Sequence, residues 1–374
     1  MAERELDVYY HGRRVGTLAE TYDKLVAFQY SDEWLADGFS ISPFHLPLKD
    51  SVFIPKPVDS SFFYGMFGVF ADSLPDSWGM LLLERSLAKQ GIDIRNINSL
   101  DRLAYVGDSG MGALEYYPAR NNSFSANGID YDLIAGECAK LLSSKPSEHI
   151  DMLFGMGGSS GGTRPKILIS EAGREWIIKF PANSDSPDSG LIEYEYSLLA
   201  GKCGINMTQT MLVSSKRCPG YFKTERFDRK VYNGEVKKIF AITFAGLLEA
   251  DFRIPSCDYS TYMKLIMILT HEDRSQIEQM FRIMCFNVFM QNLDDHTKNF
   301  SFIYDDVTGW KLAPAYDMTK SETYFGEHTT SVNGKGRDIS DDDLISVGKT
   351  AGMSYNRCKQ IIEEIKQTIG TKEA

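Results

Sequence analysis

The sequence is poor in cysteine and has no cysteine pattern typical of a metal site. Its six cysteines are scattered, and none forms a Cys-x-x-Cys pair or stands at metal-ligand spacing from a histidine. This spacing argues against a zinc site and against a disulfide framework. We therefore expect reduced, mostly buried thiols. The cysteines are Cys138, Cys203, Cys218, Cys257, Cys285 and Cys358.

Long apolar runs are also missing. The longest, such as 262–270 and 283–290, are far shorter than the roughly 20 residues that a membrane-spanning helix needs. The first residues, Met1–Leu6, have no apolar core like that of a signal peptide. Hydrophobic residues make up 43% and charged residues 24% of the 374 residues, which are ordinary globular values. We expect a cytoplasmic protein with no membrane contact, built from two or three subdomains.

Positive charge is in deficit, because 40 Lys and Arg face 51 Asp and Glu, which gives a net charge of −11. A strongly acidic chain repels phosphate backbones, so we do not expect it to bind DNA alone. A local basic patch or a basic partner could still provide such a contact.

The N-terminal third has the pattern of a small mixed α/β domain. Segments 6–11 and 14–18 flank turn residues and predict a hairpin, and 25–30 could add a strand. Residues 76–90 are apolar at helical spacing after Pro75, which predicts a helix. Residues 112–118 then predict a closing strand.

The middle of the chain changes character after a polar, turn-rich stretch at 119–127, the best candidate for a linker. A glycine-dense loop at 155–162 precedes two apolar runs, 166–170 and 175–180, which predict a strand–turn–strand unit. Residues 190–202 then predict a helix with one apolar face.

From about Tyr259 onward the pattern is mainly helical. Residues 274–292 predict a helix, and 354–369 predict an amphipathic final helix. Two short β-like segments, 299–304 and 310–312, interrupt this helical run.

A polar cluster lies between the helix expected to end near Asn292 and the strand expected to begin at Phe300. Phosphoryl transfer needs a loop of this kind, with a carboxylate to orient the attacking hydroxyl and an amide oxygen to hold magnesium. In kinase-like catalytic loops the Asp and the Asn are five residues apart. Asp294 and Asn299 have this spacing, whereas Asp295 and Asn299 do not.

A second carboxylate, Asp317, follows the expected strand pair, where it could chelate the same metal. The alternative is that the Asp/His/Lys/Asn cluster only caps a helix and solvates a turn. The position of Asp317 favours the catalytic interpretation.

The glycine-rich segment is a candidate phosphate loop, because glycines let backbone N–H groups approach an anion closely. It does not fit the Walker pattern, since Gly162 is followed by Thr163, and it does not fit the dinucleotide pattern, since a strand follows. By itself it could equally be a flexible linker.

Lys179 lies in an apolar strand, where burial is costly unless an anion meets its charge. A phosphate would satisfy it, and so would Glu193 or Glu195 from the next helix. The alternative is an edge lysine that points outward. Arg226 and Asp228 end another expected strand, where a two-lobed kinase has the hinge that receives adenine; a surface charge cluster is the alternative.

Taken in chain order, these motifs resemble the HipA family of bacterial serine/threonine kinases, the toxins of type II toxin–antitoxin modules. The resemblance covers nearly the whole chain. The segments that carry it are 15–18, 74–77, 106–113, 158–166, 176–181, 193–194, 225–229, 294–301, 315–317 and 331–335.

The resemblance implies that Asp294 is the catalytic base and that Asn299 and Asp317 are the magnesium ligands. Many relatives have a small residue where this chain has Asp295. We therefore expect Asp295 to add a second carboxylate near the metal, which could alter metal affinity.

The resemblance also implies an ATP site. Lys179 would contact the phosphates with Glu193 as its helix partner, and Glu225 and Phe227 would bracket adenine. The nucleotide contacts implied in this way are Gly161, Gly162, Lys179, Glu193, Glu225, Phe227, His296 and Tyr316.

In relatives the glycine-rich loop carries a serine whose autophosphorylation ejects the loop and silences the kinase. Counting back from Lys166 puts that serine at Ser159, and the adjacent Ser160 leaves the assignment open.

The expected fold is therefore α+β, a two-lobed protein-kinase-like fold. A small mixed α/β N-terminal subdomain would span 1–120, the nucleotide-binding small lobe with the glycine-rich loop 121–228, and the mainly helical catalytic lobe 229–374.

The expected function is that of an ATP- and Mg²⁺-dependent serine/threonine protein kinase, a toxin that arrests growth by phosphorylating a translation-related protein. In relatives the target is an aminoacyl-tRNA synthetase. The implied partner is a small helix-turn-helix antitoxin of HipB type, through which DNA would be reached indirectly. Two alternatives stay open: an antitoxin-binding corepressor without kinase activity, and a small-molecule phosphotransferase.

Overall fold

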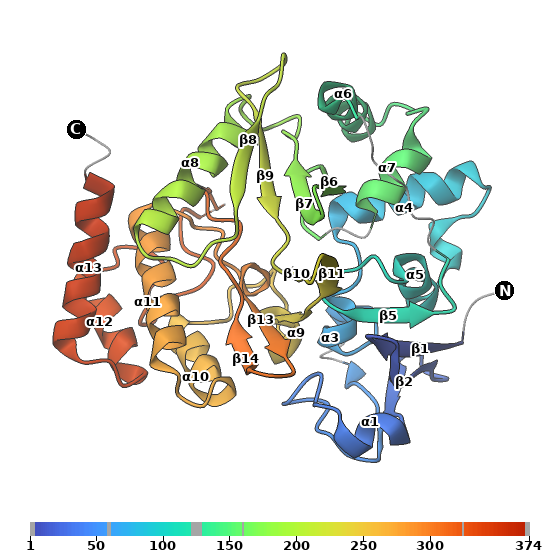
Figure 1. Ribbon diagram of the computed structural model, residues 1–374, viewed down its shortest axis with the longest axis horizontal. Helices are drawn as coiled ribbons and strands as arrows, with labels where there is room; N and C mark the ends of the chain where they lie inside the picture. Colours follow the sequence, from blue (N-terminus) through green and yellow to red (C-terminus); the bar gives the residue numbers. More distant parts are fainter. Residues whose placement is uncertain (1–3, 58–60, 121–128, 159–160, 324, 371–374) are drawn as a thin grey trace. The chain divides into compact units, whose positions relative to one another are not determined.

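A computed structural model describes residues 4–57, 61–120, 129–158, 161–323 and 325–370 (Figure 1). The chain forms two compact units. Unit 1 comprises 1–190, 213–242 and 246–249, and unit 2 comprises 191–212, 243–245 and 250–374. The chain thus passes between the units several times, and crossing points lie in α8 (Ser189–Lys202), β8 (Thr210–Val213), β12 (Phe240–Thr243) and α9 (Phe244–Leu248).

The first sheet of unit 1 has five strands in the order β4-β3-β2-β1-β5. The hairpin β1–β2 turns at His11 and Gly12, both with positive φ, a conformation that suits a tight two-residue turn. Alternate residues of β1 are buried, as expected for a sheet with one covered face. The predicted hairpin, third strand and closing strand are confirmed. The strands are β1 (Glu5–Tyr10), β2 (Arg13–Glu20), β3 (Val26–Tyr30), β4 (Val52–Phe53) and β5 (Leu114–Tyr117).

The helices of unit 1 include the one predicted at 76–90, which is α4 (Ser77–Lys89) with Asp76 at its N-cap. A capping box between Asn98 and Asp101 starts α5. The remaining helices were not predicted. Unit 1 contains α1 (Asp32–Asp37), η1 (Ser61–Phe63), α3 (Gly68–Ala71), α4, η2 (Ile94–Asn96), α5 (Ser99–Val106), α6 (Tyr131–Leu142) and α7 (Ile150–Gly157).

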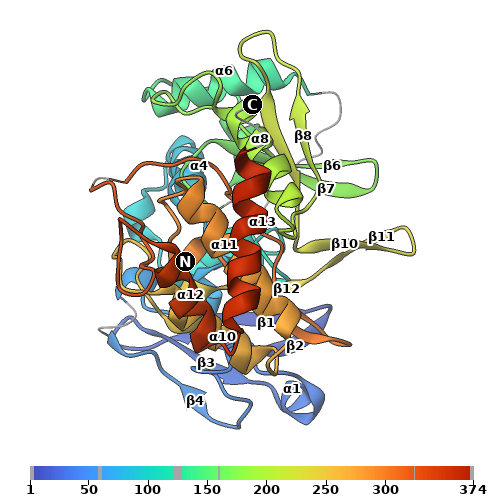
Figure 2. The same cartoon turned by 90° about the vertical axis from the view of Figure 1, so that its left-hand side faces the viewer.

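A second sheet of unit 1 contains the predicted strand–turn–strand unit, β6 (Lys166–Glu171) and β7 (Arg174–Lys179), with β9 (Tyr221–Glu225) beside β7. Apolar side chains of this sheet pack with α4, α6 and α7 in one buried cluster, which includes Trp78, Leu153 and Ile178. This core connects the glycine-rich loop, between α7 and β6, to the N-terminal helix α4. The exposed hairpin β10 (Arg229–Tyr232) and β11 (Glu235–Lys238) follows β9 (Figures 1 and 2).

Unit 2 is mainly helical, as predicted, and its short β13–β14 hairpin confirms the expected β insert. Figure 2 shows α10, α11, α12 and α13 side by side, and α11 packs with both α10 and α13. Their buried residues, among them Tyr262, Phe281 and Ile361, form the core. The unit also contains α8 (Ser189–Lys202), α10 (Tyr259–Leu269), α11 (Arg274–Phe289), η3 (Thr297–Asn299), β13 (Ser301–Asp305), β14 (Gly309–Leu312), α12 (Asp341–Thr350) and α13 (Tyr355–Gly370).

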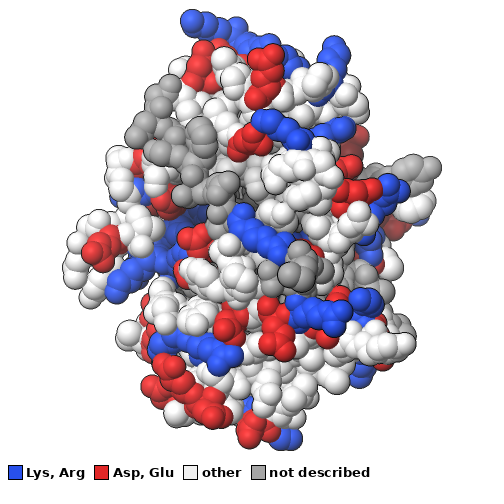
Figure 3. Space-filling view, turned by 90° about the vertical axis from the view of Figure 1, so that its right-hand side faces the viewer, with Lys and Arg blue, Asp and Glu red and all other residues white. Residues whose placement is uncertain are grey.

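The side-chain surface mixes charges of both signs. On the face drawn in Figure 3, basic and acidic groups are interspersed. Four of the six cysteines are buried, which confirms the expectation of mostly buried thiols; the two half-buried ones are Cys218 and Cys257. Within the described part of the chain, no helix combines the length and apolarity that crossing a membrane requires. The expected linker at 119–127 lies almost entirely outside the described residues.

Candidate functional site

The predicted catalytic loop lies in unit 2, between the end of α11 and the start of β13. The Asp294 side chain is 56% exposed, while the backbone of Asp294 is held on both sides. Its N–H donates to Oγ of Ser321 at 2.9 Å, and its carbonyl oxygen accepts from Nδ2 of Asn299 at 2.6 Å. The two residues singled out by their five-residue spacing are therefore directly bonded, with the Asp294 carboxylate presented to solvent.

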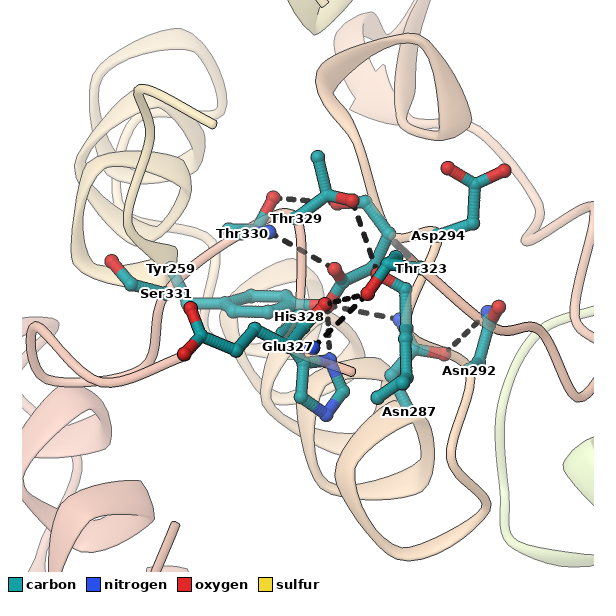
Figure 4. Close-up of polar contacts among 12 residues, drawn as sticks. Tyr259, Asn287, Asn292, Asp294, Thr323, Glu327, His328, Thr329, Thr330 and Ser331 are labelled. Carbon is teal, nitrogen blue, oxygen red and sulfur yellow. Dashed lines mark hydrogen bonds and ion pairs between the residues drawn. The ribbon is translucent and has the colours of Figure 1, made fainter. Parts of the chain in front are cut away.

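Asp295 has the opposite orientation and is 1% exposed. Its Oδ2 accepts from the Tyr259 hydroxyl at 2.8 Å and lies 2.9 Å from Nδ1 of His328, and its Oδ1 accepts from the Thr330 N–H at 3.0 Å. Figure 4 shows Asp294 pointing away from this hydrogen-bonded group. The expectation that Asp295 adds a carboxylate near the metal was wrong, because its carboxylate faces the core.

The pKa values of the neighbouring phenols reflect this environment. Burial, together with the charge of Asp295, raises the pKa of Tyr259 well above its usual value. Burial likewise raises the pKa of Tyr262, which is hydrogen-bonded to Thr330 at 2.9 Å. Both phenols are therefore held in the neutral, hydrogen-donating form.

The two predicted magnesium ligands, Asn299 and Asp317, are joined to the same group of polar residues. Asn292 donates from Nδ2 to the Asp317 carbonyl at 3.4 Å and accepts from Ser321 at 2.9 Å. Asp317 has φ of 52°, an uncommon conformation for a residue other than glycine, which indicates that its surroundings fix it.

The donor set of these two residues suits a hard cation. Asn299 uses its Nδ2 group to bond Asp294, so its Oδ1 is the atom left to face a metal. An amide oxygen and a carboxylate are ligands that Mg²⁺ prefers, with water and substrate phosphates completing its shell. No group of three or more His, Cys, Asp or Glu in the described ranges is arranged to hold a metal. Asn299 and Asp317 thus fit a Mg²⁺ that takes few protein ligands.

His296 and Tyr316, predicted to line a nucleotide pocket, have different surroundings. The Nδ1 atom of His296 is buried and has no hydrogen-bond partner within the described part of the protein, and its ring contacts Phe252. The Tyr316 hydroxyl donates to the Lys298 carbonyl at 2.8 Å and is 2.6 Å from Oγ of Ser301. Tyr316 therefore stabilises the C-terminal side of the catalytic loop, whereas His296 retains an unused polar atom.

Unit 1 contains Lys179, predicted to contact phosphates, next to the end of the glycine-rich loop. Lys166 on β6 and Lys179 on β7 are directly opposite each other in the antiparallel register. Two like charges in this position are unfavourable unless an anion or hydrogen bonds compensate them. Lys166, 7% exposed, donates from Nζ to the Gly161 carbonyl at 2.5 Å, and Lys179 is half-buried with its Nζ 5.6 Å from the Phe222 ring centroid. A role of Lys179 in binding phosphate stays a prediction.

The end of the glycine-rich loop is attached to helix α4. The Gly162 N–H donates to Oδ2 of Asp76 at 2.8 Å, and the Trp78 indole N–H donates to the Lys166 carbonyl at 3.0 Å. Gly162 has φ of 87°, and a Cβ there would lie 2.5 Å from Nζ of Lys166. A larger residue would therefore disturb the loop. The predicted autophosphorylation sites, Ser159 and Ser160, lie outside the described residues.

The strand expected to lead into a hinge ends at Glu225. Glu225 pairs with Arg174 at 3.1 Å, and Phe227 is half-buried. Glu193 is 3% exposed and belongs to unit 2, whereas Lys179 belongs to unit 1. The adenine and phosphate roles given to these residues stay predictions.

Arg226 and Asp228 are not the surface cluster that was the alternative to a hinge, since they are only 7% and 3% exposed. Asp228 accepts from both Arg226 and Arg229, and from the Gly112 N–H at 2.7 Å. Arg226 and Arg229 also donate to the Gly110 carbonyl. The cluster thus fixes the glycine-containing loop before β5, within unit 1.

Sequence reasoning assigned no role to Asp76 or Lys166, and it misplaced Asp295. A signal for Lys166 was its position directly after the glycine-rich loop at the start of an apolar strand. For Asp295 the signal was two adjacent carboxylates on a loop, since consecutive side chains of an extended backbone point in opposite directions. Asp76 could be recognised only as a helix cap.

Two models of known protein families match the chain. Residues 6–117 match the model of the HipA N-terminal domain, and residues 158–372 match that of the HipA-like C-terminal domain. The second match alone spans more than half of the chain. The protein belongs to the HipA family, and the resemblance of its motifs to that family is confirmed.

Two curated relatives come from Sinorhizobium fredii (strain NBRC 101917 / NGR234). "Putative kinase Y4mE" is 24% identical over 351 residues, covering 87% of this chain and 79% of the relative. "Putative kinase Y4dM" is 24% identical over 387 residues, covering 97% and 89%.

Among solved structures, the chain is similar to HipA from Shewanella oneidensis MR-1, determined as a complex of HipA, HipB and its operator DNA. The TM-score is 0.72 at 19% identity, over 97% of this chain and 88% of that chain. The predicted α+β, kinase-like fold is therefore confirmed.

Proposed function

We propose that the protein is an ATP- and Mg²⁺-dependent serine/threonine protein kinase, a HipA-like toxin that phosphorylates a translation-related protein in the cytoplasm. The observation that carries this proposal is the bond between Asn299 and the carbonyl of Asp294, which joins the proposed metal ligand to the proposed base. The names of the two Sinorhizobium relatives, both described as kinases, support the same activity.

In this proposal Asp294 accepts the proton of the attacking hydroxyl as the hydroxyl oxygen bonds to the γ-phosphorus of ATP. The bond from that phosphorus to the β,γ-bridging oxygen breaks, and ADP leaves. The exposure of its carboxylate allows a protein hydroxyl to reach it. Asn299 and Asp317 would hold Mg²⁺, which supplies positive charge to the phosphates when it is bound. Lys179 would bind phosphate oxygens, and Ser159 or Ser160 would be the autophosphorylation site.

The likeness to the Shewanella protein supports a partner. That protein was solved with HipB and its operator DNA. We propose that this chain binds a helix-turn-helix antitoxin of HipB type and reaches DNA through it, in agreement with its net charge of −11. Co-purification with the product of a neighbouring helix-turn-helix gene tests the partnership, and no binding to any such neighbour would refute it.

The test of the activity is a labelling experiment. The purified protein is incubated with γ-labelled ATP, Mg²⁺ and a cell lysate, and phosphorylated residues are identified by mass spectrometry. We expect label on serine or threonine of one or a few proteins, and on Ser159 or Ser160. Label in a metabolite fraction alone would instead identify a small-molecule phosphotransferase, and no label in either fraction would refute the proposal.

A further inference from the structure

Asp295 is a buried carboxylate with a complete set of hydrogen bonds, in a loop whose chemistry is assigned to its neighbour. Removing a carboxylate from water is costly, and the cost is offset here by Tyr259, His328 and Thr330. The Asp295 carbonyl also accepts from Oγ1 of Thr330 at 2.5 Å. Segment 328–331, which supplies two of these partners, is in turn bonded to the loop through Thr329, whose N–H donates to the Leu293 carbonyl at 2.9 Å.

A chain of hydrogen bonds, which we call the loop anchor, connects the Asp295 carboxylate with the backbone N–H of Asp294. It consists of the side chains of Ser321, Asn292, Asn287 and Tyr259 in that order. The Asp294 N–H donates to Ser321, Ser321 donates to Asn292, Asn292 donates to Asn287, Asn287 donates to Tyr259, and Tyr259 donates to Asp295, all at 2.8–3.0 Å.

Every donor in the loop anchor points the same way. The chain begins at a backbone N–H and ends on a carboxylate oxygen that accepts. Successive hydrogen bonds of one direction polarise one another, and in a buried site this effect is large. Asp295 therefore determines the hydroxyl orientation of Tyr259 and, through the two asparagines, that of Ser321. Figure 4 shows Tyr259, Asn287 and Asn292 on the side of the loop opposite the Asp294 carboxylate.

We propose that Asp295 is a positioning residue for phosphoryl transfer, which it serves through the loop anchor rather than by touching substrate or metal. This inference rests on the proposed kinase function. Because Asp295 is fixed in the core, the adjacent Asp294 carboxylate points the opposite way. The position of the Asp294 carbonyl, to which Asn299 donates, is fixed as well. Asp295 therefore holds both the proposed base, Asp294, and the proposed metal ligand, Asn299, in position.

The test compares two buried tyrosines. Tyr259→Phe removes the hydroxyl that joins Asn287 to Asp295, whereas Tyr116→Phe removes an equally buried hydroxyl that bonds Ser73 in unit 1. Phosphotransfer from ATP is measured as kcat and KM for both, together with the melting temperature. Asp295→Asn is a third variant, because its amide places a donor where the Thr330 N–H or the Tyr259 hydroxyl needs an acceptor.

We expect Tyr259→Phe and Asp295→Asn to lower kcat by about tenfold or more, with KM for ATP within about twofold, as for a misplaced catalytic group. Tyr116→Phe should lower the melting temperature similarly and leave kcat within about twofold of wild type. Equal loss of kcat in both tyrosine variants, or no loss in Tyr259→Phe, overturns the inference. The proposed function still stands in that case if the wild-type protein is active. An inactive wild type overturns both.

Discussion

The Nδ2 group of Asn299 donates a hydrogen bond of 2.6 Å to the carbonyl oxygen of Asp294. Because the amide nitrogen is used in this way, the orientation of the side chain is fixed and its oxygen is the group available to a cation. One hydrogen bond therefore connects the two functions that phosphoryl transfer needs, a base and a metal ligand.

Replacing Asn299 by Ala should remove both roles at once. We expect phosphotransfer to fall by about 10²-fold, the size typical for loss of one contact to developing charge. The Mg²⁺ concentration for half-maximal rate should rise. Removing Mg²⁺ with a chelator should abolish transfer in the wild type and restore it on re-addition. Steady-state rates across a Mg²⁺ titration provide the measurement.

The control for this variant is Asn183→Ala, which removes an exposed amide that donates to Oγ of Ser143 at 2.9 Å. It should leave the Mg²⁺ titration unchanged. An Asn299→Ala protein with the wild-type rate and Mg²⁺ dependence would contradict the assignment of the metal ligand.

Asp76→Ala should loosen the glycine-rich loop, since Oδ2 of Asp76 accepts the Gly162 N–H at 2.8 Å. A lost hydrogen bond of this kind corresponds to about 1 kcal/mol, or about fivefold. We expect KM for ATP to rise by about that factor with little change in kcat. Asp93→Ala, at the start of η2, serves as the control. An unchanged KM in a folded Asp76→Ala protein would exclude a role for this contact in nucleotide binding.

Asp228→Asn should strongly destabilise unit 1. The variant leaves two buried guanidinium groups, Arg226 and Arg229, without their counter-charge, and breaking a buried pair costs about 3–5 kcal/mol. Denaturant unfolding gives the free energy of unfolding. The comparison pair is Arg253, whose side chain is 62% exposed, with the half-buried Asp251, and Asp251→Asn should lose at most about 1 kcal/mol. Equal effects of the two substitutions would contradict the structural role of the cluster.

The difference in the free energy of unfolding between wild type and Asp228→Asn also depends on pH. Although burial acts against it, the charges of Arg226 and Arg229 hold the pKa of the Asp228 carboxyl well below its usual range. A carboxyl whose pKa is lowered on folding contributes stability that is complete above the unfolded pKa, near 4, and is lost as the pH falls through the folded pKa.

The difference in the free energy of unfolding between wild type and Asp228→Asn should therefore stay constant above about pH 5 and shrink only below about pH 4. Denaturant titrations at a series of pH values measure it. A difference that already shrinks between about pH 7 and pH 5 would show that Asp228 has no such depressed pKa.

Elements with strong periodicity could be predicted from the sequence. The hairpin at β1–β2, the helix α4 and the helices α11 and α13 have apolar patterns and turn residues that determine their type. The hairpin β10–β11 was missed although Asn233-Gly234 is a strong turn signal. Its strands are exposed on both faces, so they have no alternation of apolar and polar residues to recognise.

The sequence was enough to predict which residue types of the catalytic loop take part in the chemistry. It was not enough to predict in which direction their side chains point. Spacing separated Asp294 from Asp295, but the partners of Asp295 are more than 30 residues away, at Tyr259, His328 and Thr330. The same holds for Asp76 and Gly162, which are 86 residues apart. Such contacts depend on tertiary packing, which local patterns do not encode.

The central claim, that this chain transfers the γ-phosphate of ATP with Asp294 as base, is tested most directly by one comparison. Wild type and Asp294→Asn are incubated with γ-labelled ATP and Mg²⁺, and protein-bound label is followed over time. Because the Asp294 side chain is 56% exposed, the variant should fold and melt like the wild type. Transfer should fall by about 10²–10⁴-fold. Wild-type rates in a folded Asp294→Asn protein would contradict the assignment of Asp294 as the base.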